Sequence, residues 1–173
     1  PMGSGFGSSA AACVALARLI APPNCGAELL WRAANRGEAV FHGTPSGIDT
    51  GLARGGGLFL IQFEEGRFPR RSPLETSDLY IVAGTVPRER STKELVAGLA
   101  ELRGRKPLEV RSRLDRLGAI TLEASRLLTE SAASEIGALA DEAQALLTEL
   151  DLSSESLDDV LGIARSMGAR GAK

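Results

Sequence analysis

Apolar residues recur at helical spacing through the first third of the chain. Residues 8–20 are rich in alanine and leucine, and the run is apolar on nearly all sides. This predicts a buried helix whose N-terminus Ser8 or Ser9 can cap, and which ends before a Pro-Pro pair. Two further helices are predicted over residues 28–38, where Gly37 is an unfavourable position, and over residues 48–53.

Two short apolar runs in the middle of the chain favour β-strands. Residues 58–63 follow three glycines, and residues 79–83 form a second run that we expect to be a buried strand. Between them, residues 67–76 are polar and contain prolines, which predicts a connector between two domains.

The pattern from residue 91 onward predicts helices. Apolar residues at helical spacing indicate helices over 92–103, 108–131 and 136–150. A last helix is expected behind Ser153 or Ser154 and should end at Gly168. The helix lengths share no fixed period, so a repeat architecture is not indicated.

Composition excludes several classes of function. The 173 residues carry a formal net charge of −2, and aromatic residues make up only 4%, so neither a basic nucleic-acid surface nor a stacking platform is indicated. No apolar run approaches the ~20 residues of a membrane span. Cys13, Cys25 and the single His42 cannot complete a four-ligand zinc site, and two free thiols are typical of a reducing cytoplasm.

A loop rich in glycine and serine precedes the first predicted helix. Residues 1–10 read PMGSGFGSSA. Glycines let backbone N–H groups approach a ligand, and a helix N-terminus adds unpaired N–H groups with positive dipole character. This combination is typical of a phosphate-binding site.

Three known phosphate loops do not fit this sequence. A Walker A loop requires a Gly-Lys-Ser/Thr sequence, and no lysine is present. A dinucleotide-binding loop requires glycine at the position of Ser8. A protein-kinase loop leads into a strand, whereas an alanine-rich run follows here. A purely structural glycine-rich turn remains the alternative.

Two carboxylates flank a second segment rich in turn residues. Residues 38–49 read EAVFHGTPSGID, with Glu38 and Asp49 at the two ends. Phosphoryl transfer to an alcohol needs an oxygen ligand for Mg²⁺ and a carboxylate near the acceptor hydroxyl, roles that suit these residues. The alternative is that Glu38 is a surface acid and Asp49 a helix cap. His42 fits a structural hydrogen-bonding role better than a ligand or a base.

Both segments resemble motifs of the GHMP kinase superfamily. Its phosphate loop is similar to residues 1–10, with Phe6 as the one mild departure. Residues 42–49 (HGTPSGID) resemble the form that the next motif takes in the mevalonate kinases. Residues 90–96 (RSTKELV) resemble the segment that opens the first helix of their second domain, and residues 156–160 fit the helix before their last motif. The resemblance therefore extends over essentially the whole chain.

The resemblance also implies a role for each matching residue. ATP phosphates would be wrapped by Gly3, Ser4, Gly5, Gly7 and Ser8. Ser9 would bind Mg²⁺ and a phosphate oxygen, Glu38 would be the magnesium carboxylate, and Asp49 would face the acceptor hydroxyl as catalytic base. Thr92 and Asp49 would lie at the substrate. The implied reaction is phosphorylation of mevalonate to 5-phosphomevalonate with ATP. Another small-molecule kinase, such as a phosphomevalonate kinase, and a non-catalytic ATP sensor are the alternatives.

The fold that the resemblance implies is α+β, with two domains and the site in the cleft between them. Residues 1–75 would be part of the N-terminal domain, similar to ribosomal protein S5 domain 2, and residues 76–173 part of a ferredoxin-like C-terminal domain. The family's N-terminal strands with their lysine, and its last glycine-rich motif, have no counterpart here. We therefore expect a piece truncated at both ends and inactive alone, from a cytoplasmic enzyme that binds a small molecule and no nucleic acid or membrane, with a homodimer as the candidate assembly.

Overall fold

A computed structural model describes residues 6–64, 68–76, 79–87, 89–130 and 132–173. The chain divides into two compact units, Pro1–Leu74 and Glu75–Lys173, and each is described by itself. No helix among these described residues is long and apolar enough to cross a membrane.

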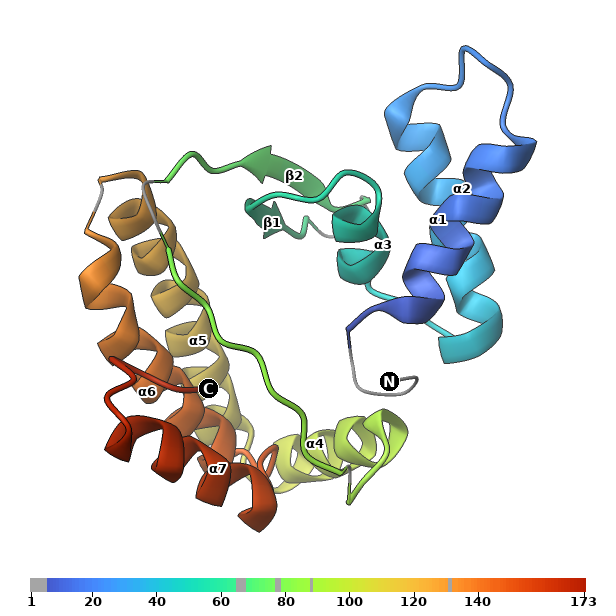
Figure 1. The fold of residues 1–173 in the computed structure, drawn as a ribbon. Helices are drawn as coiled ribbons and strands as arrows, with labels where there is room; N and C mark the ends of the chain where they lie inside the picture. Colours follow the sequence, from blue (N-terminus) through green and yellow to red (C-terminus); the bar gives the residue numbers. More distant parts are fainter. Residues whose placement is uncertain (1–5, 65–67, 77–78, 88, 131) are drawn as a thin grey trace. The chain divides into compact units, whose positions relative to one another are not determined.

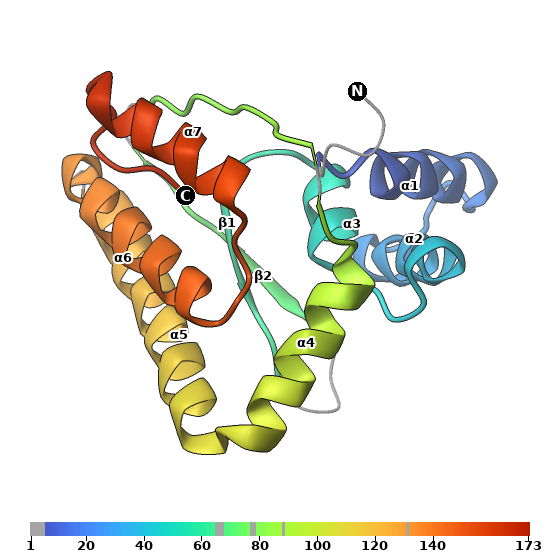
Figure 2. The same cartoon turned by 90° about the horizontal axis from the view of Figure 1, so that it is seen from below.

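Two packed helices form the core of the first unit. The helices α1 (Ser8–Ile20) and α2 (Ala27–His42) lie side by side, and the short helix α3 (Ile48–Ala53) contacts both (Figures 1 and 2). The buried residues at their contact are Cys13, Val14, Ala17 and Ala34, with Leu30 and Ala53 packed against them. The predicted helices over residues 8–20 and 48–53 are confirmed.

The predicted capping and burial of α1 are wrong. The residue that caps the helix is Gly7, with φ 69°, and neither serine makes a side-chain capping bond. The Ser9 hydroxyl instead donates to Glu38 on α2. Nor is the helix buried all round, because Leu19 is 81% exposed and Leu16 is exposed as well. Only the face made of small residues packs against α2.

The second helix is longer than the sequence predicted. It continues through Gly37 to His42 and ends at Gly43. A Cβ atom at Gly37 would lie 3.4 Å from the Cys13 Sγ, so glycine at this position allows α1 to approach closely. Packing therefore outweighs the low helix propensity of glycine. As a consequence, Glu38 lies well inside a helix and not at its last position.

A hairpin takes up part of the predicted domain connector. Strand β1 (Phe59–Gln62) pairs antiparallel with β2 (Arg70–Pro73), with Phe59 opposite Pro73 and Gln62 opposite Arg70. The strand predicted over residues 58–63 is confirmed. The boundary between the two units, after Leu74, falls within the predicted connector over residues 67–76, but part of that segment forms β2. Arg71 stabilises the second strand, because its guanidinium lies 3.4 Å from the centroid of the Phe59 ring.

Trp31 holds the turn between α2 and α3. Its indole N–H lies 2.9 Å from the carbonyl oxygen of Gly47 and 3.2 Å from the Thr50 hydroxyl. The Thr50 hydroxyl lies 3.2 Å from the amide oxygen of Asn35. The ring packs directly against Gly51, where a Cβ atom would lie 2.5 Å from the indole Cζ2. The orientation of α3 is thus set by a buried aromatic side chain.

The secondary structure of the second unit, in its described residues, is helical. The helices are α4 (Thr92–Arg105), α5 (Pro107–Thr129), the short 3₁₀ helix η1 (Ala133–Glu135), α6 (Ile136–Glu149) and α7 (Glu155–Ser166), shown in yellow-green to red in Figure 1. The main apolar cluster joins α5 to α6 through Ile120, Leu127, Leu139 and Ala143. The predicted helices are confirmed to within a few residues at their ends.

The helix starts in this unit follow the sequence signals. Ser91 and Glu94 form a reciprocal capping box at α4, and the Ser154 side chain caps α7 by accepting from the Leu157 N–H. Arg90 fixes the turn before α7, since its guanidinium donates to Asp151 Oδ2 at 2.8 Å and to the Ser153 carbonyl at 2.8 Å.

The strand predicted over residues 79–83 does not form. In this segment Tyr80 is 90% exposed and Val82 99% exposed, and it pairs with no strand among the described residues. A strand needs a partner for its backbone groups, so an apolar run alone does not produce one. The ferredoxin-like sheet expected for this unit is therefore not seen in its described residues.

We expect Gly51→Ala to destabilise the first unit by about 1–3 kcal/mol, because the added methyl group overlaps the Trp31 ring. Chemical denaturation followed by the fluorescence of the single tryptophan measures this. Gly98→Ala is the matched control. Nothing lies within 4 Å of its added methyl group on α4, and it should stabilise the chain by about 0.5–1 kcal/mol. Equal effects of the two substitutions would contradict the role of Trp31.

We expect an acid-dependent contribution from Asp141 to the stability of the second unit. Burial alone would raise the pKa of Asp141, but the Ala172 N–H and the Arg165 guanidinium hold the pKa below its ordinary value of 3.8. The carboxylate therefore stabilises the fold above pH 3.8, and this contribution is lost as the pH falls through the lower pKa of the folded state.

Asp141→Asn should accordingly cost about 0.5–1 kcal/mol at neutral pH, a small value because solvent screens the partly exposed pair with Arg165. Urea denaturation of wild type and variant should converge at strongly acidic pH. Asp115→Asn, at an exposed ion pair on α5, should change little at any pH. A difference for Asp141→Asn that persists in acid would exclude the charged interaction as its cause.

Candidate active site

The end of the glycine-serine loop leads directly into α1. Gly7 has the left-handed φ of 69°, which glycine adopts without strain, and the helix begins at Ser8. Ser8 is exposed and Ser9 is half-buried. Gly3, Ser4 and Gly5, the other residues predicted to bind phosphate, lie outside the described residues.

A partly buried hydrogen bond joins the loop end to α2. The Ser9 hydroxyl donates to Glu38 Oε1 at 2.7 Å, although the two residues are 29 positions apart in the sequence. Glu38 is only 2% exposed, so the alternative of a surface acid is wrong. A carboxylate is kept in such a place only with hydrogen-bonding or cationic partners, because its burial alone is costly.

Asp49 lies in the first turn of α3, close to the same loop end. A Cβ atom at Gly7 would be 3.9 Å from the Cβ of Asp49, and the Asp49 side chain is exposed. Gly47, and not Asp49, is the N-cap of α3. The structure thus brings together Ser9 at the start of α1, the buried Glu38 on α2 and the exposed Asp49 on α3, all within one unit.

Thr92 belongs to the second unit. It is the first residue of α4, follows the capping residue Ser91 and is exposed. The structure describes each unit by itself, so its predicted position at the substrate stays a prediction.

Cys13 is a neighbour of this site that the sequence did not reveal. It is 8% exposed, lies one turn after Ser9 on the same face of α1, and packs against Gly37. Burial raises the pKa of the Cys13 thiol, and a hydrogen bond to Glu38 and the charge of Glu38 raise it further. The four-residue spacing between Ser9 and Cys13 is the one sequence signal that places both on the same face of the helix. It points to the site only once the structure shows that Glu38 lies beside that face.

The donors gathered here suit a magnesium ion better than zinc. No group of three or more His, Cys, Asp or Glu side chains that could hold a metal occurs in the part of the chain that the structure describes. Ser9 and Glu38 offer hard oxygen atoms, and Mg²⁺ is typically held by one or two carboxylates together with substrate phosphates and water. The residues present therefore fit Mg²⁺ bound together with a nucleotide.

Comparison with known proteins finds a family that matches the first part of the chain. Residues 1–56 match the family described as GHMP kinases N terminal domain. This range contains the loop end, Glu38 and Asp49, which are the parts of the site just described. The first third of the chain is thus similar to the N-terminal domain of the GHMP kinases.

Within that superfamily the chain is similar to mevalonate kinases. It is 33% identical to the mevalonate kinase of Thermococcus gammatolerans over 100% of this chain and 53% of the relative. It is 32% identical to that of Schizosaccharomyces pombe over 97% of this chain and 47% of the relative. The resemblance inferred from residues 42–49 and 90–96 is confirmed.

A solved structure shows the same fold. The crystal structure of L. major mevalonate kinase in complex with R-mevalonate superposes with a TM-score of 0.80 and 24% identity, and covers 96% of this chain and 52% of that one. The chain spans about half the length of the curated relatives it matches.

We expect the two cysteines to differ in reactivity. Cys13 is buried and its thiol has a raised pKa, whereas Cys25 lies partly exposed between α1 and α2. Iodoacetamide at mildly alkaline pH should therefore alkylate Cys13 at least about tenfold more slowly than Cys25, because the thiolate is the reactive form. Mass spectrometry of the digested chain measures both rates. In denaturant the rates should become equal. Similar rates in the folded chain would contradict the packing of Cys13 under Glu38.

Proposed function

We propose that the full-length protein to which this chain belongs phosphorylates mevalonate with ATP, giving 5-phosphomevalonate and ADP. The observation that carries this proposal is the hydrogen bond from Ser9 to the buried Glu38, with Asp49 beside Gly7. A phosphate loop, a buried carboxylate and an exposed carboxylate at one place suit phosphoryl transfer to an alcohol. The similarity to mevalonate kinases favours mevalonate as the acceptor.

Each residue has a part that its position suits. The loop that ends at Gly7 and Ser8 would bind the ATP phosphates with backbone N–H groups at the start of α1. Ser9 and Glu38 would hold Mg²⁺, which neutralises charge on the phosphates when it is bound. Asp49 is accessible, and its carboxylate would orient the acceptor hydroxyl and accept its proton. Most of the rate enhancement would come from positioning and charge stabilisation.

The second unit would contribute to the acceptor side of the site. Thr92, at the exposed start of α4, is the residue we assign to substrate binding. Residues 1–75 and 76–173 would then be parts of the N-terminal and C-terminal domains of the kinase. Because the chain spans about half the length of its relatives, we assign turnover to the full-length protein and expect none from these 173 residues alone. We place the enzyme in the cytoplasm, with a small-molecule substrate and a homodimer as its candidate assembly.

Asp49→Asn and Glu38→Gln in the full-length protein separate these roles. Asp49→Asn should lower kcat by about 10²–10⁴-fold, the usual contribution of an acid-base group, while ATP binding is retained. Glu38→Gln should weaken the Mg²⁺-dependent binding of ATP as well as turnover. A coupled assay of ADP release measures turnover, and calorimetry measures binding. Glu101→Gln on the exposed face of α4 is the control and should change neither. Loss of ATP binding in Asp49→Asn would contradict its assigned role.

The same assay decides the acceptor. Mevalonate, phosphomevalonate, galactose and homoserine are offered separately with Mg-ATP, and we expect turnover with mevalonate alone. Turnover with another acceptor would move the assignment to a different kinase of the superfamily. ATP binding without any turnover would indicate a sensor that has kept the fold.

A further inference from the structure

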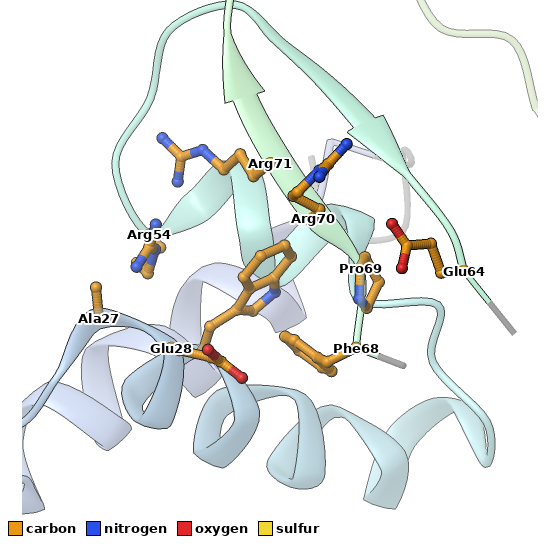
Figure 3. Close-up of a pocket in the computed structure, with 9 residues that line it drawn as sticks. Ala27, Glu28, Arg54, Glu64, Phe68, Pro69, Arg70 and Arg71 are labelled. Atoms are coloured by element: carbon orange, nitrogen blue, oxygen red, sulfur yellow. The ribbon is translucent and has the colours of Figure 1, made fainter. Parts of the chain in front are cut away.

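A cavity of the first unit is lined at the start of α2 and not by Ser9, Cys13 or Glu38. It has a volume of about 440 Å³, and its walls come from the start of α2, the end of α3 and the hairpin (Figure 3). None of the residues assigned to ATP, Mg²⁺ or mevalonate lines it. It therefore needs an explanation separate from the proposed kinase site.

Positive charge gathers on one wall of this cavity. Figure 3 shows Arg54 and Arg71 on one side, and Arg70 with Glu64 on the opposite side. Neither Arg54 nor Arg71 makes an ion pair with a carboxylate among the described residues. Burial, followed by the positive charge of Arg54, lowers the pKa of the Arg71 guanidinium from its ordinary value. Two guanidinium groups held this close repel each other, and a bound anion would relieve the repulsion.

The fold fixes one of these two side chains in place. Arg71 donates to the carbonyl oxygen of Gly51 at 2.7 Å and to that of Gly56 at 3.4 Å, and it stacks on the Phe59 ring. These contacts use two of its five N–H donors and leave others for a ligand. Arg54 is positioned through its backbone, because its carbonyl oxygen accepts a hydrogen bond from Arg18. The Arg54 side chain itself donates no hydrogen bond among the described residues.

The carboxylates of the cavity do not neutralise this wall. Glu28 is paired with Arg32 at 2.7 Å, one turn along α2. Glu64 lies on the side of Arg70. The remaining surface is apolar, since Phe68 packs edge-on against Trp31 with ring centroids 4.6 Å apart and Pro69 adjoins them. The cavity thus has the guanidinium groups of Arg54 and Arg71 on one side and an apolar floor, formed by Phe68 and Pro69, beside them.

We propose that this cavity binds a small phosphorylated molecule, with its phosphate between Arg54 and Arg71 and its apolar part towards Phe68 and Pro69. Guanidinium groups recognise phosphate through paired N–H donors, and a preorganised Arg71 reduces the entropy lost on binding. The site is distinct from the proposed ATP site and does not depend on it.

Phenyl phosphate and inorganic phosphate are the probes, and Trp31 is the reporter. Trp31 lines the cavity and is the only tryptophan of the chain. Titration of the 173-residue chain at constant ionic strength should give a saturable change in tryptophan fluorescence. Phenyl phosphate should bind more tightly than inorganic phosphate because of the apolar floor. Arg54→Gln should weaken binding at least about tenfold, the loss typical of one hydrogen bond to a charged group.

Control variants separate loss of the binding site from damage to the fold and from binding at the proposed ATP site. Arg54→Gln leaves the backbone contact with Arg18 intact, whereas Arg71→Gln would also remove bonds that hold the hairpin. Arg103→Gln, an exposed change on α4, should bind phenyl phosphate like the wild type. Ser9→Ala, at the proposed ATP site, tests whether the loop binds the probe instead. No saturable signal in the wild type would overturn the proposal. A signal that survives Arg54→Gln but is lost in Ser9→Ala would assign the phosphate to the loop instead.

Discussion

The close contact between α1 and α2 is the constraint on which the first unit depends. Small residues make it possible: Cys13 on α1 packs against Gly37 on α2, with Ala17 and Ala34 in the same cluster. This approach brings the Ser9 hydroxyl within 2.7 Å of Glu38 and buries the carboxylate. The Ser9–Glu38 hydrogen bond therefore depends on the apolar contact beside it. The geometry of the proposed site is set by the packing of α1 against α2.

Local signals in the sequence predicted much of the fold. The helix over residues 8–20, the cap at Ser154 and the helix end before Gly168 follow from propensity and capping chemistry, which act within a few residues. The site was predictable in part for a different reason. The spacing of Glu38 and Asp49 after the loop suggested phosphoryl transfer, and the structure brings Glu38 to Ser9 and Asp49 to Gly7.

What the sequence did not predict depends on partners distant along the chain. Residues 70–73 form a strand because β1 lies beside them, whereas the more apolar residues 79–83 pair with no described strand. Cys13 gains its environment from Glu38, and Trp31 gains its role from Gly51 and the turn at Gly47. In each case the local pattern is ambiguous and a long-range contact decides the outcome.

The fit between Cys13 and Gly37 also restricts how this sequence can change. A side chain larger than a methyl group at position 37 needs a smaller residue at position 13, because a Cβ atom at position 37 would already contact the thiol at 3.4 Å. Substitutions at the two positions should therefore be coupled, so that natural variants exchange them in compensating pairs while their combined volume stays nearly constant. Positions 13 and 37, which have no catalytic role of their own, would then covary because the geometry of the site is under selection.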